Sequence, residues 1–290
     1  MNRLLSVAGS LCLALGLAAC GVQDEEGEDE DRYLPADQRV RSLTLPCDEY
    51  TLSPFEMRTL DYAEDLLVRD CMRRHGMDWQ VLPVPEEEGT DPAHRRRYGV
   101  IEMEVARQYG YGAPPGAADE VLVEETRQER LTLLATEHRA AHGSEGETGC
   151  LEEAAGDITA GVPDMDYDLL NSYIHASFEA SRSAPPVVDA FSAWSACMAE
   201  RGLDYPTPPE AWAEERWAEG EDDPSTEEKE VAMADVACKE DASVVEVWRE
   251  AEAAEQEDLI EEHPEDFALF AQVRDVQLET ARTALERFGS

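Results

Sequence analysis

The stretch "CMAERGLDY" (197–205) repeats, 126 positions later, the pattern of "CMRRHGMDW" (71–79). Each copy holds Cys-Met, a glycine five residues after the cysteine, and an aspartate followed by an aromatic residue. Glycine readily ends a helix, and the prolines that follow each copy favour an extended chain. The repeat therefore predicts two helix ends with a cysteine just before each. The methionines are expected to fill the apolar helix face rather than bind a metal.

Helix-start signals support this interpretation. Ser53, Pro54 and Glu56 have the spacing of an N-cap, a first helical residue and a capping box, and apolar residues then recur at helical intervals up to Gly76. A Pro-Pro pair begins the corresponding pattern that ends at Gly202. Both copies therefore have the same predicted course: a helix, a cysteine, a glycine stop and an extended exit.

Each copy is followed by one more cysteine in a helical setting. In an oxidising compartment, one further cysteine after each copy predicts the disulfides Cys71–Cys150 and Cys197–Cys238, although the sequence also allows other pairings. These two disulfides would close loops of 79 and 41 residues. Cys47 is left without a partner. It is a free thiol, half of an intermolecular bridge or a competitor for one of these pairs, and we expect a semi-buried free thiol.

The N-terminus predicts export and lipidation. Residues 1–19 hold Arg3 followed by an apolar run that ends in small residues, as in a secretory signal peptide. The segment "LAACG" (17–21) looks like a bacterial lipobox, which makes Cys20 the lipidated first residue of the mature chain. The alternatives are an ordinary signal peptide or a short membrane anchor, but the run is shorter than the roughly 20 residues of a spanning helix. We expect a lipid-anchored protein on the extracytoplasmic face of the cell membrane.

Charge excludes some partners. Removal of residues 1–19 takes away one base and leaves 66 acids against 23 bases, a formal charge of −43. Nucleic acids and anionic headgroups would be repelled, so membrane association rests on the lipid. The acidic run at 24–31 predicts a disordered tether within residues 20–40. The sequence does not separate acidity used for solubility from an acidic surface for a cationic partner.

The composition is typical of a mainly α protein, because aromatic and β-branched runs are scarce. We predict a helical bundle-like domain with two internally similar helix-Cys units, one in residues 41–165 and one in residues 166–290. A helix is expected near 119–141 and another near 166–182. A capping box at Ser225 and Glu228 predicts a long helix up to about Glu262, followed after His263-Pro264 by a second one, as a C-terminal antiparallel helical hairpin.

Motifs for chemistry are weak. "DMDYD" (164–168) resembles the start of a calcium loop, but lacks the required glycine and the final glutamate. His138 and His142 share a helical spacing without a third ligand, and Arg95–Arg97 is expected to be an internal counter-charge. We therefore predict no catalytic residue, no metal and no cofactor.

The chain resembles a family of uncharacterised lipoproteins and secreted proteins from actinobacteria, of the Streptomyces type. The resemblance is carried by the two repeats and by "LPCDEYTLSP" (45–54), "RRRYGV" (95–100), "YGYGAPP" (109–115), "FSAWSACMAERGLDYPTP" (191–208), "VAMADVACK" (231–239) and "VVEVWREAEAA" (244–254). Similarity of this kind covers about residues 40–287. It implies a common fold and an envelope location without an established activity. An aliphatic residue is usual in the family where Cys47 stands, so the resemblance argues against an essential bridge at Cys47.

Together these features favour a non-enzymatic binding or interaction module that contacts an envelope protein or a cell-wall polymer, with the C-terminal hairpin as the candidate contact surface. The alternatives are an extracytoplasmic or cell-wall hydrolase with a carboxylate site, and a binder of small cationic ligands.

Overall fold

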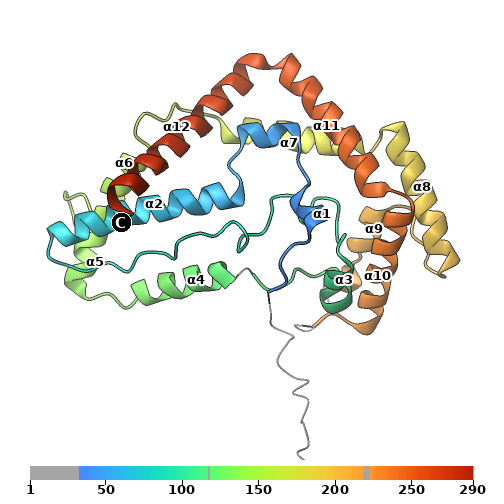
Figure 1. Cartoon of the computed structure of the whole chain (residues 1–290), viewed down its shortest axis with the longest axis horizontal. Coiled ribbons are helices and arrows are strands. Elements are labelled where there is room, and N and C mark those ends of the chain that lie inside the picture. Colours follow the sequence, from blue (N-terminus) through green and yellow to red (C-terminus); the bar gives the residue numbers. More distant parts are fainter. Residues whose placement is uncertain (1–32, 117, 218–222, 290) are drawn as a thin grey trace, which may run out of the picture. The chain divides into compact units, whose positions relative to one another are not determined.

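Helices make up the regular structure of the computed structural model, which describes residues 33–116, 118–217 and 223–289. Within these ranges there is no β-strand, so the predicted mainly α fold is confirmed. The signal peptide, Cys20 and residues 21–32 of the predicted tether lie outside the described residues. Residues 33–40, which we expected in the disordered tether, instead include Ala36 and Val40 buried in the core. In chain order the α-helices are α1 (Gln38–Arg41), α2 (Pro54–Arg74), α3 (Met103–Tyr109), α4 (Ala118–Arg130), α5 (Ala135–His142), α6 (Cys150–Ile158), α7 (Tyr167–Ser181), α8 (Pro185–Glu200), α9 (Pro208–Trp212), α10 (Thr226–Asp241), α11 (Val244–Glu262) and α12 (Pro264–Phe288), with 3-10 turns η1 (Pro46–Tyr50) and η2 (Glu215–Trp217) (Figure 1).

The predicted helix starts are present. Ser53 and Glu56 form the complete capping box of α2, with reciprocal bonds of 3.1 and 2.8 Å. At α10 only half of the predicted box forms: Ser225 caps the Glu228 amide, but the Glu228 carboxylate accepts a bond from the Tyr111 amide instead. A long-range contact thus takes the place of the local one.

The repeated motif forms the same helix end twice. In the first copy the Met77 amide donates to the Met72 carbonyl and the Gly76 amide donates to the Arg73 carbonyl, with Gly76 at φ +72°. These are the two bonds of a Schellman motif, which needs a left-handed residue at the glycine position. Met72 and Met77 also belong to one apolar cluster, as that motif favours.

The second copy repeats these bonds residue for residue. Leu203 donates to Met198, Gly202 donates to Ala199, and Gly202 lies at φ +79°. Met72 and Met198 are fully buried, which agrees with the prediction that they fill the helix face.

Two predicted helices are interrupted. The long helix expected after Ser225 is wrong as a single element, because Ser243 adopts a left-handed conformation (φ +50°) and separates α10 from α11. The helix expected near 119–141 is divided into α4 and α5 by residues 131–134. Neither break contains a glycine or a proline, so the sequence carries no local stop signal there.

The predicted C-terminal antiparallel hairpin is wrong: α11 and α12 follow one another in the chain, but they diverge and pack on different partners (Figure 1). α11 packs against α7, α8 and α10, whereas α12 packs along α2 and α6 (Figure 1). α12 therefore joins the second predicted part of the chain to the first. The large apolar residues of these helices, which we expected to form a contact surface, lie in the core: Trp248, Phe267 and Phe270 are almost fully buried.

Trp248 lies at the centre of the largest core cluster. Its ring centroid is 5.1–5.2 Å from those of Tyr98, Phe178 and Phe191, and its indole nitrogen donates to the Ser181 hydroxyl at 2.9 Å. Burial of large aromatic rings is the main stabilising term in such a core, and the indole N–H needs a partner there. Among the described helices, none has both the length and the apolar character needed to cross a membrane.

Candidate functional site

Both predicted cysteine pairs lie at disulfide distance. Cys71 and Cys150 have their Cα atoms 5.5 Å apart, and Cys197 and Cys238 have theirs 5.6 Å apart. We call these the first and second disulfides. The first joins the last turns of α2 to the first residue of α6, and the second joins α8 to α10.

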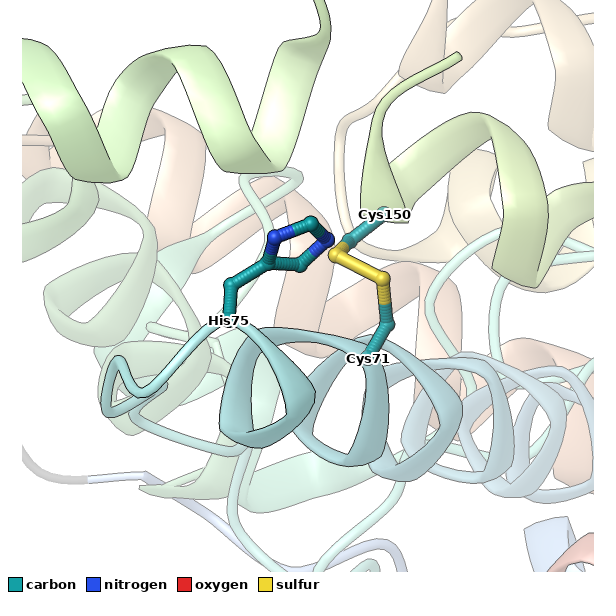
Figure 2. Close-up of side chains that lie close together, drawn as sticks. All are labelled: Cys71, His75 and Cys150. Carbon is teal, nitrogen blue, oxygen red and sulfur yellow. A yellow bond between two sulfur atoms is a disulfide. The ribbon is translucent and has the colours of Figure 1, made fainter.

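The surroundings of the two disulfides differ. Figure 2 shows the His75 ring facing the sulfurs of the first disulfide from the end of α2, and the Glu153 carboxylate lies 3.6 Å from the Cys71 sulfur. At the second disulfide the Arg201 guanidinium lies 2.6 and 3.1 Å from the two sulfurs.

Cys47 is a buried free thiol in η1, less exposed than the semi-buried thiol that we expected. Its neighbours include Leu170, Phe267 and Phe270. Burial, and then the charge of Asp48, raise the pKa of the Cys47 thiol to about 12. Such a thiol is a poor nucleophile at neutral pH.

The weak motifs have structural roles. Asp166, within the calcium-like run, is the N-cap of α7 and accepts from the amides of Asp168 and Leu169. His138 and His142 stack on each other at 4.3 Å on an exposed face of α5.

The arginine run provides internal counter-charges, as predicted. Arg95 is buried between Asp91 and Glu102, and Arg97 pairs with the buried Glu252. Arg96 donates to the carbonyls of Tyr111 and Gly112.

A pocket that sequence reasoning missed lies between residues 41–55 and 87–94, with a volume of about 510 Å³. This is within the usual range for small-molecule sites. Leu43, Pro54 and Phe55 contribute apolar walls. The Arg41 guanidinium holds the two sides together, because it donates to the Ala36 and Glu88 carbonyls at 3.1 and 2.9 Å.

A histidine–carboxylate pair lies in the wall of this pocket. The His94 Nε2 atom is 2.8 and 3.0 Å from the two Asp48 oxygens, and the Leu45 amide also donates to Asp48. Four carboxylates (Asp48, Glu87, Glu88 and Asp91) line the pocket against one guanidinium and one imidazole. The site is therefore acidic, and its shape and charge suit a ligand with a cationic group.

One side of the pocket is firmly held. Asp91 accepts from Arg95 at 2.6 Å and from the Tyr33 hydroxyl at 3.1 Å. Burial, followed by the charge of Asp91, raises the pKa of Tyr33 to about 12, so this hydroxyl stays a donor at neutral pH. Asp91 is thereby occupied, whereas Glu87 and Glu88 are exposed at the rim.

No local signal in the sequence could have identified this pocket. Asp48 and His94 stand 46 residues apart, and "LPCDEYTLSP" and the residues before the arginine run are ordinary loop sequences. Only the fold brings them together.

Searches with this chain find no matching family model, no similar curated protein and no similar solved structure. The fold and its bonds alone define the class: an acidic, all-α protein with two cysteine pairs at disulfide distance.

Proposed function

We propose that this protein is a lipid-anchored binding module of the cell envelope, without catalytic activity of its own, and that it binds a cationic group in the Asp48–His94 pocket. The observation that carries the proposal is the pocket itself, which combines apolar walls with an excess of carboxylates. The lipobox-like segment at Cys20 and the cysteine pairing support an extracytoplasmic location.

The ligand class follows from the unsatisfied charge. Asp91 is held by Arg95, and Asp48 by His94 and the Leu45 amide, so an incoming ammonium or guanidinium group would first meet the exposed Glu87 and Glu88 and could then compete with His94 for Asp48. Such charge-assisted bonds are stronger than neutral ones. A free small cation and a lysine- or arginine-bearing chain of an envelope polymer or protein share this chemistry.

Calorimetry on a soluble fragment of residues 32–290 tests the site, because Arg32–Ser290 forms one compact unit. Titration with a panel of amines, polyamines and basic peptides is expected to identify a ligand. Its affinity should fall about tenfold or more in Glu88→Gln and in Asp48→Asn, because the loss of one charge-assisted hydrogen bond weakens binding by about that much. Asp258→Asn removes an exposed acid outside the pocket and serves as the matched control. Thermal unfolding of each variant separates lost binding from lost folding. Equal affinity in all variants would contradict this binding site.

In-cell crosslinking of the tagged full-length protein tests the envelope role. One dominant membrane-fraction partner, crosslinked near the pocket, would support an interaction module. Recovery of the protein alone would shift the proposal to a small free ligand.

The Asp48–His94 pair also favours a second candidate, a hydrolase, because an imidazole oriented by a carboxylate is the base of many hydrolases. Within the described residues, however, no hydroxyl or thiol is hydrogen-bonded to His94. Peptidoglycan turnover by the purified fragment that disappears in His94→Ala would establish this candidate and contradict a purely binding role.

A further inference from the structure

The repeated motif differs at one chemically decisive position. Four residues after the first cysteine of each copy, the first disulfide has His75 and the second has Arg201. Residues four apart lie on the same face of a helix, so each side chain is directed to its own disulfide. An imidazole is a metal ligand, whereas a guanidinium is not.

The donors at the first disulfide are close enough to share one ion. The sulfurs of Cys71 and Cys150 and a ring nitrogen of His75 all lie within 4.8 Å of one another, and Figure 2 shows the ring directed at the sulfurs. Tetrahedral zinc at about 2.3 Å from sulfur and about 2.0 Å from nitrogen requires donors roughly 3.5–3.8 Å apart. Small side-chain rotations therefore suffice once the sulfurs are no longer bonded to each other.

We propose that reduction of the first disulfide converts it into a site for a divalent cation of the zinc type, with Cys71, His75 and Cys150 as ligands. A dithiol supplies two electrons and two protons to the two sulfurs and itself becomes a disulfide. The cation then binds both sulfurs as thiolates and releases two protons. Glu153, with an oxygen 3.6 Å from the Cys71 sulfur, is within reach as a fourth ligand, although its other oxygen is paired with Arg74.

Local electrostatics favour the first site over the second. Cys150 is the first residue of α6, where the helix N-terminus stabilises a thiolate. At the second disulfide the Arg201 guanidinium lies against both sulfurs and the Asp241 carboxylate is 3.8 Å from the Cys197 sulfur, so the place that His75 takes at the first disulfide is filled by a cation that cannot bind a metal. The second disulfide therefore serves as an internal control for metal binding at the first.

Cobalt titration tests the proposal on the full-length mature protein, reduced with a dithiol that is removed anaerobically. We expect one Co²⁺ per reduced chain with thiolate charge-transfer and tetrahedral absorption bands, and none of these bands in the oxidised protein. His75→Arg, which gives the first copy the residue of the second, is expected to weaken binding by at least about 100-fold, since even outer-shell changes cost about 10- to 100-fold. Arg201→Ala and Cys47→Ser are expected to bind as the wild type does.

Alkylation mapping identifies the ligands independently of the spectrum. Bound Co²⁺ should slow the alkylation of Cys71 and Cys150 relative to the reduced, metal-free protein and leave the alkylation rates of Cys197 and Cys238 unchanged. Unchanged affinity in His75→Arg, protection of the second pair, or no cobalt bands in the reduced wild type would overturn the proposal. If circular dichroism shows that reduction unfolds the chain, Co²⁺ should restore helix in the wild type and not in His75→Arg, and failure to do so would overturn it equally.

Discussion

At the scale of single residues, Lys239 shows how this acidic protein buries charged groups. Its ammonium group donates to Asp235 at 2.8 Å and to the Val100 carbonyl at 3.0 Å, and both side chains are almost fully buried. Asp235 also accepts from the Trp194 indole at 2.9 Å. Burial raises the pKa of the Asp235 carboxyl and lowers that of the Lys239 ammonium, and each group relies on the other to remain charged.

Lys239→Met is therefore expected to destabilise the fold by about 3–5 kcal/mol, because it leaves a buried carboxylate without its counter-charge. The double variant Lys239→Met, Asp235→Asn should recover much of this loss, since no charge is then buried and the amide still accepts from Trp194. Urea unfolding of the oxidised protein measures the free energy of unfolding of the single and the double variant. A loss below 1 kcal/mol in the single variant would show that the pair is not buried as described.

Cys47 gives a second prediction at this scale. With a pKa of about 12, its thiolate population at pH 8 is on the order of 10³-fold below that of an ordinary cysteine. Iodoacetamide should therefore label it on the order of 10³-fold more slowly in the folded protein than in urea, and the folded-state rate should rise about tenfold per pH unit between pH 8 and 10. Equal rates in both states would place the thiol at the surface.

The helix ends are the elements that the sequence predicted best. Caps and glycine stops are local signals, so Ser53, Glu56, Gly76 and Gly202 could be assigned their roles directly. The break at Ser243 could not be predicted, because its left-handed conformation lies in a run of helix-compatible residues. The candidate pocket was missed for a different reason: its residues come from separate segments that only the tertiary fold brings together.

Replacement of the stop glycines tests the element scale. Gly76→Ala and Gly202→Ala are each expected to lower the free energy of unfolding by about 1–2 kcal/mol, because a side chain disfavours the left-handed conformation. No neighbour lies within 4 Å of the added methyl group at either position, so the effect would come from the backbone alone. Gly156→Ala, in the exposed middle of α6, is the matched control and should stabilise by about 0.5–1 kcal/mol. Neutral effects at 76 and 202 would contradict the paired Schellman motifs.

At the scale of the whole molecule, two disulfides join helices that are far apart in the chain. The loops they close span 79 and 41 residues. In the chain-entropy model each bridge contributes roughly 4 kcal/mol. Replacing either pair with alanine should therefore lower stability by similar amounts, measured by denaturant unfolding without reductant. A pair whose removal changes nothing is not bridged in the native protein.

Mass spectrometry of the unreduced protein, isolated from cell membranes, tests most directly whether this is a lipid-tethered fold with two disulfide-bonded helix ends. We predict an acylated N-terminal peptide that begins at Cys20, bridged peptides for Cys71–Cys150 and Cys197–Cys238, and Cys47 as a free thiol. A peptide that joins Cys71 to Cys197, or a chain with an unmodified Cys20, would contradict it.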